Sequence, residues 1–301
     1  MPDSSKAIQQ DGKSNIRSAL VKAFESWAEP YDIKPSGVFG SVAKITSGSV
    51  SLSSETLDIE FDVPFDDDME PNEAEIIIYN LSYDTVNQLK KGAAISIEAG
   101  YKGDTGVLFN GFISKVSTDY EGADKVVKVK ALDDVKSHSI ESMSFAAGTK
   151  ASYILKTLIQ KTGIPLAVFK IQRDHTYEDS QTVDGDLMKN IKNYAAVCGI
   201  SAYVSKSKIY ARHIKEGDAL NFTLSAETGL IGSPKPFTEE VKAEDFTDTI
   251  NGYEADMLLQ YRISAGAIIN LKGKHASGTY RVCSGRHSFS GYETITSIKM
   301  Y

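Results

Sequence analysis

The chain has 301 residues, of which 41% are hydrophobic and 24% are charged. This composition is typical of a folded globular protein and excludes disorder over most of its length. The formal net charge of −7 and the lack of a long basic run argue against nucleic acid as a main binding partner.

The first 36 residues are predicted to form an arm with one short helix. Apolar residues recur at helical spacing from Ile16 to Trp27, and Pro30 ends the pattern. The polar N-terminus has no signal-peptide core, and no apolar stretch reaches the about 18 residues that would span a bilayer. We therefore expect synthesis in the cytoplasm and no membrane anchor. Because such a short terminal helix is marginal in water, we expect it to dock on the body or on a neighbouring subunit.

Residues 37–138 have the pattern of antiparallel strands. Apolar and acidic residues alternate over residues 57–63, which predicts a half-buried strand. The segment 82–92 interrupts this pattern and predicts one short helix, with Ser82 as its cap and Gly92 after its end. A small β-barrel is an economical way to bury five or six such strands and to cover their edges.

The pattern changes to mixed α/β over residues 139–214. One apolar helical face ends at Gly163, and Asp184 or Asp186 can begin a second helix. A tight hairpin follows over residues 201–214. We predict a compact α/β insertion domain.

Strand patterns return over residues 215–301, with glycines at hairpin spacing, and predict a second small β-barrel. The fold class is therefore mainly β: two small barrels, an α/β insert between them and an N-terminal helical arm. Residue-level similarity between the two β regions is too weak to establish them as copies of one unit.

Acidic residues suggest at most a cation site, and we weigh this against a simpler interpretation. They crowd one loop at Asp66, Asp67, Asp68 and Glu70, and a second group comprises Asp179, Asp184 and Asp186. Hard cations take several carboxylates, but the spacing of an EF-hand loop is absent. A solvated loop explains the first group, and helix capping explains Asp184 and Asp186.

No catalytic, cofactor-binding or metal-binding residue is predicted. The five histidines show no zinc-ligand spacing: they are His138, His175, His213, His275 and His287. Cys198 and Cys283 are expected to be free thiols, since they stand far apart and outside any CxxC motif. No nucleophile elbow, P-loop or dinucleotide-binding motif occurs.

The segment 73–116 resembles the phage baseplate hub family, also called tail protein D or XkdQ-like proteins. The family pattern is a strand ending in YNLS, a short helix, KG, a strand ending in AGY-x-G, and then LF-x-G-x-I. Its residues in this chain are Tyr79, Asn80, Leu81, Ser82, Lys91, Gly92, Ala99, Gly100, Tyr101, Gly103, Leu108, Phe109, Gly111 and Ile113. The α/β insert and the segment from Gly278 to the last strand also resemble the family, so that the resemblance spans about residues 40–301. The arm before residue 36 does not map onto it.

The resemblance implies a structural protein of the virion tail baseplate, or of a phage-tail-like particle such as a contractile injection system, made in a bacterial host. Hubs of this family carry two tube-like barrels per chain, and three chains form a ring with pseudo-sixfold symmetry. The implied partners are two further copies of the chain, the tail tube protein, the central spike protein, other baseplate proteins and the tape measure protein. DNA is implied only as cargo passing through the channel, and no cofactor is implied.

Two other functions remain open from the residues alone. A tail-associated cell-wall hydrolase would require an active site, which no motif supplies. A receptor- or carbohydrate-binding β module would require exposed aromatic clusters, and the 15 tyrosines keep this alternative open.

Overall fold

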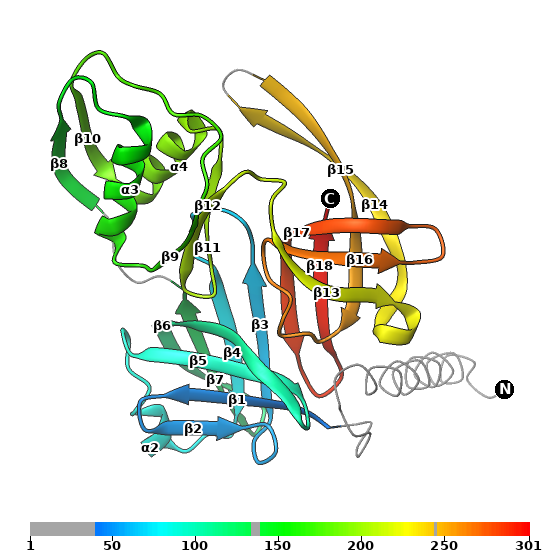
Figure 1. Cartoon of the computed structure of the whole chain (residues 1–301). Coiled ribbons are helices and arrows are strands. Elements are labelled where there is room, and N and C mark those ends of the chain that lie inside the picture. Colours follow the sequence, from blue (N-terminus) through cyan, green and yellow to red (C-terminus); the bar gives the residue numbers. More distant parts are fainter. Residues whose placement is uncertain (1–39, 134–138, 244–245) are drawn as a thin grey trace.

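The structure is a computed structural model that describes residues 40–133, 139–243 and 246–301 (Figure 1). The predicted arm of residues 1–36, with its helix, lies outside the described residues. Within the described ranges, no helix has the length and apolar character needed to cross a membrane.

Seven strands and one short helix form the first β region, residues 40–133. The strands are β1 (Ser41–Ser47), β2 (Val50–Ser53), β3 (Ile59–Phe65), β4 (Glu73–Tyr79), β5 (Ala94–Tyr101), β6 (Asp104–Glu121) and β7 (Asp124–Leu132). Burial alternates along β3 and β4, as the period-two pattern predicts. The strand pattern had indicated five or six strands.

The predicted helix between β4 and β5 is present but short. It is α2 (Tyr83–Val86), and the Ser82 side chain caps it by accepting a hydrogen bond from the Thr85 amide at 3.1 Å. The helix ends at Val86, with Asn87 as its C-cap, and so stops before Gly92. Val86 packs against the core of the first β region, and Leu89, just beyond the helix, is buried in that core.

The α/β insert over residues 139–214 contains two packed helices and two small sheets. Its elements are β8 (Ser139–Phe145), α3 (Ala151–Thr162), β9 (Leu166–Phe169), β10 (Gln181–Asp186), α4 (Leu187–Val197), β11 (Ser201–Ser205) and β12 (Lys208–Arg212). Gly163 ends α3 in the left-handed conformation (φ 71°), and the Asp186 side chain caps α4 by accepting from the Lys189 amide at 2.7 Å. Both helix boundaries were predicted.

The second β region follows as residues 215–301. Its elements are β13 (Asp218–Ser225), the 3₁₀ turn η1 (Ala226–Thr228), β14 (Leu230–Ala243), β15 (Phe246–Leu258), β16 (Ala267–Lys272), β17 (Ser277–Phe289) and β18 (Thr294–Met300). The sequence pattern missed β14, whose Pro234 and Pro236 are rare inside strands. It also placed β15 too late, at residues 252–264.

The two β regions share one sheet, which confirms the mainly β class but corrects the arrangement of closed barrels. The sheet order is β14-β15-β18-β17-β3-β4-β7-β6-β5-β1-β2, with β16 joined to β17 and β13 to β16. This path does not close on itself among the described strands. The physical reason is that β3 pairs with β17 of the other region, so that neither strand is available to close its own barrel.

Each β region instead covers its core by curling the sheet. In Figure 1, β5, β1 and β2 cross over β3, β4 and β7, and β13, β16 and the start of β17 cross over β14, β15 and β18. A buried hydrophobic cluster lies within each curl, and a third one fills the insert.

Four strands of each region have the same order. Two hairpins, β3–β4 and β6–β7, pair through β4 and β7 to give the first unit, β3-β4-β7-β6. Hairpins β14–β15 and β17–β18 pair through β15 and β18 to give the second unit, β14-β15-β18-β17. In both units the strand that comes last in this order has a further partner along its first half only. This partner is β5 for β6 and β16 for β17. We call these the two four-strand units.

Candidate functional site

One face of the shared sheet is charged, because the opposite face carries the buried residues of both units. Its acidic residues are Glu60, Asp62, Glu73, Glu75, Asp119, Glu121, Asp124, Glu254 and Asp256. Its basic residues are Lys115, Lys128, Lys130, Lys235, Arg286 and Lys299. We call this surface the charged face; acidic residues exceed basic residues on it by nine to six.

Cross-strand ion pairs hold the charged face together. Lys130 lies 2.7 Å from Glu73, and Lys299 lies 3.3 Å from Glu254. Arg286 of β17 lies 3.2 Å from Asp62 of β3, across the junction between the two units. Because these side chains are about half exposed, water screens the pairs and each stabilises the fold only slightly. The face is therefore a hydrated, mixed-charge surface rather than a strongly charged one.

The two four-strand units meet at β17 and β3, which we call the internal junction. Five residue pairs run from Gly285 opposite Phe65 to Phe289 opposite Phe61. The rings of Phe61 and Phe289 stack with centroids 5.3 Å apart, and Phe65 lies 4.9 Å from the His287 ring. A Cβ on Gly285 would lie 2.4 Å from the Phe65 ring, so that only glycine fits beside this phenylalanine.

Two edges of the four-strand units remain free within the described strands. Residues 115–121 of β6 pair with β7 on one side, while the pairing of β6 with β5 ends at Phe112. At the other end of the sheet, β14 pairs only with β15. Such edges offer unpaired backbone donors and acceptors to another chain.

Three arginine–aspartate pairs join the first β region, the insert and the second β region. Arg262 grips Asp104 of the β5–β6 turn through two bonds of 2.6 and 2.7 Å. Arg212 of the insert binds Asp218 of β13 through two bonds of 2.9 Å. These bidentate contacts have fixed geometry, so that they orient the regions as well as attract them.

Arg281 forms the third pair and is the most buried of the three arginines. Its Nη1 lies 2.5 Å from Asp67 and 2.9 Å from the Tyr301 hydroxyl, and its Nε donates to the Glu216 carbonyl at 2.9 Å. Burial raises the pKa of Asp67 even though Arg281 beside it acts to lower it. Arg281 Nη2 is buried without a hydrogen-bond partner. The pair thus costs desolvation and is held by the surrounding structure.

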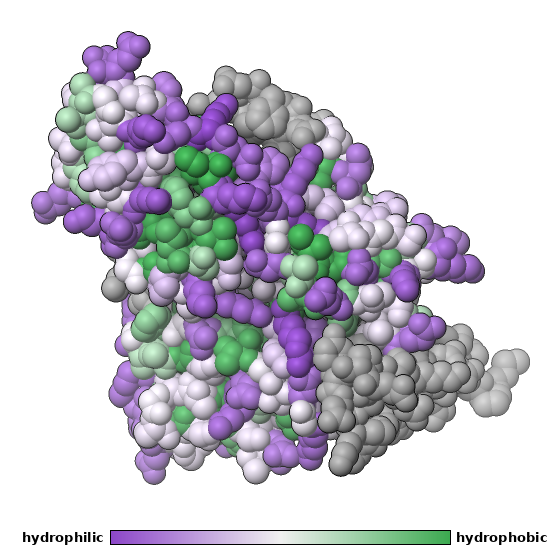
Figure 2. Space-filling model, viewed as in Figure 1, coloured by the Kyte–Doolittle hydropathy of each residue, from purple (hydrophilic) through white to green (hydrophobic). Residues whose placement is uncertain are grey.

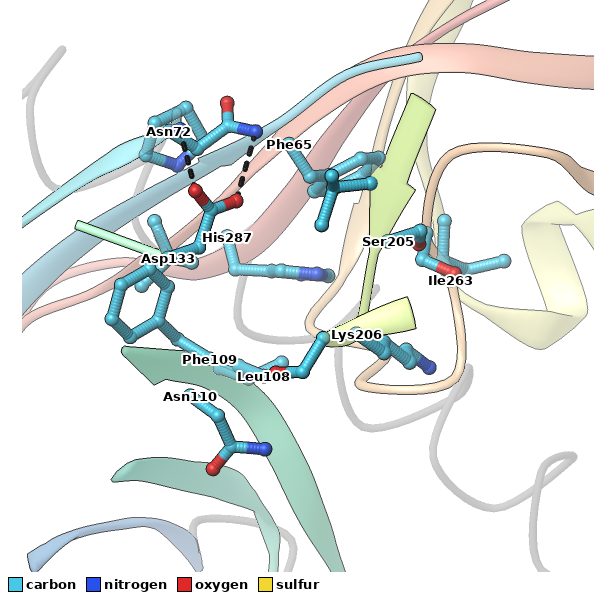
Figure 3. Close-up of a pocket in the computed structure, with 15 residues that line it drawn as sticks. Phe65, Asn72, Leu108, Phe109, Asn110, Asp133, Ser205, Lys206, Ile263 and His287 are labelled. Atoms are coloured by element: carbon cyan, nitrogen blue, oxygen red, sulfur yellow. Dashed lines mark hydrogen bonds between the residues drawn. The ribbon is translucent and has the colours of Figure 1, made fainter. Parts of the chain in front are cut away.

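A small cavity lies where the three regions meet (Figure 3). Its volume is about 40 Å³, and its lining includes His287, Lys206 and Phe65. Asp133 accepts two hydrogen bonds from Asn72, at 2.9 and 3.3 Å, on one side of it. This space holds about one water molecule and is far smaller than a typical ligand pocket.

His287 is buried beside this cavity and is not suited to acid–base chemistry near neutral pH. Its Nδ1 lies 2.9 Å from the Thr296 hydroxyl. Burial, assisted by the nearby Lys206 charge, lowers the pKa of His287 to about 3. The imidazole is therefore neutral in the folded protein and acts as a packing group of the junction.

The acidic loop and the group from Asp179 to Asp186 do not form a cation site in the described part of the chain. No group of three or more metal-ligating side chains occurs there. In the acidic loop, Asp66 and Asp68 accept hydrogen bonds from backbone amides two residues further on. Burial and the adjacent Asp68 raise the pKa of Asp66 to about 6. Asp186 is the cap of α4, as predicted, whereas Asp184 lies in β10 and does not cap the helix.

The described histidines and cysteines also lie apart. His138 lies outside the described residues, and His175 packs edge-on against Tyr177. Cys198 and Cys283 are free, as predicted, and burial raises the pKa of each thiol to about 11. Such thiols are poor nucleophiles.

One pair of exposed aromatic residues lies beside the free edge of β6. Tyr83 of α2 and Tyr120 of β6 are each 62% exposed, and their hydroxyl groups are hydrogen-bonded. The Lys125 ammonium lies 3.8 Å from the centre of the Tyr83 ring. Elsewhere, Figure 2 shows that apolar residues on the visible face gather over β9, β11 and β12, among hydrophilic surroundings.

Solved structures that resemble this fold include tail proteins. The tail protein from Neisseria meningitidis MC58 has a TM-score of 0.61 and 10% identity, covering 87% of this chain and 96% of that one. The prophage MuSo2 tail protein from Shewanella oneidensis has a TM-score of 0.60 and 9% identity, covering 86% and 97%. The E. coli c3393 protein, a component of the type VI secretion system, has a TM-score of 0.59 and 11% identity, covering 85% and 76%. At these identities the likeness concerns the fold.

The family itself follows from the sequence. A search of curated protein sequences finds no match. The profile of the baseplate hub gp41 family matches residues 69–246, which is more than half of the chain. This stretch includes most of the first four-strand unit, the whole insert and β14. The chain therefore belongs to the baseplate hub gp41 family and is a structural hub protein of the virion tail baseplate.

Proposed function

We propose that three copies of the chain form the hub ring, which leaves a central channel and joins the sixfold tail tube to the threefold central spike. The observation that carries this proposal is the repeat of one four-strand unit within one chain. Three copies would contribute six units, a number that matches a sixfold tube. The whole chain would repeat only three times, which matches a threefold spike.

The free edges of the sheet support a closed ring. The first unit ends in β6 and the second begins with β14, so that the two edges of one copy are different surfaces. Contacts between unlike surfaces produce rings when the rotation closes. A ring would cover both of these edges in every copy, so that they would not be open to unspecific strand pairing.

The charged face is the surface that we assign to the channel. Its mixed charges, with an acidic excess, would repel a polyanion weakly on average and attract it strongly at no point. DNA would then pass as cargo without binding. The other partners that we propose are the tail tube protein, the central spike protein, other baseplate proteins and the tape measure protein.

A role without enzymatic activity accords with the site chemistry. The cavity at the junction is about 40 Å³, and the histidine beside it is neutral and buried. We expect no lysis of peptidoglycan in a zymogram of the purified chain. A clear lytic band that is lost on heat denaturation would contradict this part of the proposal.

The location is tested by antibody-gold labelling of tail particles in the electron microscope. We expect gold at the host-proximal end of the tube, where the tube meets the spike. Label along the shaft would instead make the chain a tube or sheath component, and would contradict the proposal.

A further inference from the structure

We infer that, in the proposed ring, the free edge of β6 in one copy pairs antiparallel with β14 of the next copy, in the register of the internal junction between β17 and β3. The inference rests on the proposed ring and names the surface that closes it. The partner is a second copy of the chain. The template for the contact is present within each chain, because the same two kinds of strand already pair there.

The equivalence of β6 and β17 follows from an irregularity that both share. The pairing of β6 with β7 shifts between Ile113 and Lys115, and the pairing of β17 with β18 shifts between Val282 and Ser284. When the two shifts are aligned, each residue of β6 corresponds to the residue of β17 that lies 169 positions later (282 − 113). Residues 116–120 of β6 then correspond to residues 285–289, which are the β17 residues that pair with β3.

The equivalence of β3 and β14 follows from a lysine–glutamate pair that recurs in both units. Lys130 lies opposite Glu75, and Lys299, which is 169 residues further on, lies opposite Glu254. In turn, Glu75 lies opposite Asp62 of β3, and Glu254 lies opposite Lys235 of β14. Lys235 therefore corresponds to Asp62, a difference of 173 residues (235 − 62).

When the register of the internal junction is applied to β6 and β14 of neighbouring copies, two opposite charges face each other. In the internal junction Ser288 lies opposite Asp62. The corresponding residues of the copy–copy contact are Asp119 (288 − 169) and Lys235. Both side chains are exposed on the charged face, and neither forms an ion pair with another described residue. Opposite charges in directly facing positions stabilise a strand pair.

The opposite face is complementary in volume. Gly285 lies opposite Phe65 in the internal junction, which pairs the smallest side chain with a large one. The corresponding pair between copies is Val116 with Thr238, two side chains of intermediate size. The summed side-chain volume of Val116 and Thr238 is therefore similar to that of Gly285 and Phe65.

The exposed Tyr120 lies on the same edge. It corresponds to Phe289, which stacks on Phe61 inside the chain. The contact would therefore bury part of an aromatic surface that is 62% exposed in one chain.

Residues of these two edges also limit unspecific strand pairing. Pro236 has no amide hydrogen and can only accept a hydrogen bond, so that the ladder along β14 is incomplete. On β6, Lys115 and Asp119 place charges beside the edge. Pairing between copies therefore depends on side-chain complementarity and not on the backbone alone.

Cysteine cross-linking in the full chain tests the register. The double variant Asp119→Cys with Lys235→Cys should give covalent dimers and trimers on mild oxidation, since facing residues in antiparallel strands have Cα atoms about 4.5–5.5 Å apart. The matched control is Glu60→Cys with Lys235→Cys, because Glu60 lies on the same face but in the interior of the sheet. The control and both single Asp119→Cys and Lys235→Cys variants should stay uncross-linked.

The mass of the unoxidised double variant separates the hypothesis of a trimeric ring from the hypothesis of this strand register. A trimer that does not cross-link through these cysteines, or that cross-links equally in the control, would overturn the register and leave the ring in place. Absence of a trimer both in solution and in isolated particles would overturn the ring and the register together.

A charge exchange tests the same pair without a cross-link. Asp119→Lys and Lys235→Asp should each weaken association by up to about fivefold per contact, and the double exchange should restore it. Glu60→Lys, on the same face but away from the edge, should leave association unchanged. Equal losses in the two single variants and the double variant would contradict the pairing.

Discussion

The two four-strand units have the same strand order but different surroundings. The first unit is covered by the antiparallel pair β1 and β2 and carries α2, whereas the second is covered by β13, which runs parallel to β16. Its hairpin β14–β15 also extends well beyond the sheet (Figure 1). The comparison shows that the order of the paired strands is kept while the covering elements vary.

The units differ again where each meets a neighbour. At the internal junction β17 presents Gly285 and the buried His287, whereas the corresponding residues of the free β6 edge are Val116 and the exposed Thr118. A permanent contact inside one chain can thus rely on tight packing. A contact that forms only on assembly must use residues that tolerate water beforehand.

The largest effect should come from removing Arg281, which joins the two units through Asp67. In Arg281→Ala the largely buried Asp67 carboxylate loses its counter-charge, and we expect a loss of about 3–5 kcal/mol in the free energy of unfolding. Urea denaturation measures it. The double variant Arg281→Ala with Asp67→Ala should recover part of the loss, and a loss below about 1 kcal/mol in the single variant would show that the pair does not join the units.

A core substitution in one unit tests whether the two units unfold together. Ile76 is fully buried in the first unit and Met257 in the second. Ile76→Ala and Met257→Ala should each cost about 2–5 kcal/mol. Because the sheet is continuous, each variant should keep one cooperative transition, followed by circular dichroism and by tyrosine fluorescence. A separate early transition for the altered unit would contradict the description of a single sheet.

The close packing at the internal junction predicts an intermediate effect. Gly285→Ala places a Cβ against the Phe65 ring and the Ser297 carbonyl, each 2.4 Å away, and should cost about 1–3 kcal/mol by thermal denaturation. Gly291→Ala, where nothing lies within 4 Å, is the matched control and should change stability by less than about 0.5 kcal/mol. Equal effects in the two variants would show that the junction is loosely packed.

Acid should destabilise the junction through His287. Its folded pKa of about 3 lies below the unfolded value near 6.5, so that the unfolded chain binds the proton more tightly. Stability is full above pH 6.5 and falls as the pH drops from there toward 3, by about 1.4 kcal/mol per pH unit. Asp66, whose pKa is raised to about 6, opposes part of this loss, because the folded form binds its proton more tightly.

The comparison of His287→Gln with His275→Gln isolates this contribution. His275→Gln is the matched control, a substitution of an exposed histidine. His287→Gln should reduce the slope of the unfolding free energy against pH between pH 6.5 and 4 relative to this control. An unchanged slope in His287→Gln would assign the acid sensitivity to other groups.

The smallest effect should come from the exposed pair at the same junction. Arg286 is 59% exposed and pairs with Asp62, so that Arg286→Ala should cost less than about 1 kcal/mol in the urea measurement. A loss comparable to that of Arg281→Ala would mean that the charged face carries much more of the stability than its exposure suggests.

Local features of the fold could be predicted from the sequence, because they depend on neighbouring residues. Ser82, Asp186 and Gly163 mark helix ends by hydrogen-bonding and conformational preferences that act within a few residues. Alternation along β3 likewise reports burial directly. The free thiols were also predictable from the residues.

The sharing of one sheet could not be predicted, because it depends on a contact between residues more than 200 positions apart, such as Val63 and His287. No local pattern distinguishes a strand that closes its own barrel from one that pairs elsewhere. The strand β14 was missed for a related reason: Pro234 and Pro236 disfavour a strand, and only the position of β14 at a sheet edge makes them tolerable. The charged face and the free edges followed only once the strand order was known.

The most direct test of the proposed ring is the mass of the hub complex released intact from tail particles, measured by native mass spectrometry. Six four-strand units per ring predict a complex that contains three chains of 32.8 kDa each. A complex with six chains, or a chain that leaves the particle only as a monomer, would contradict the proposal that each chain supplies two units to one ring.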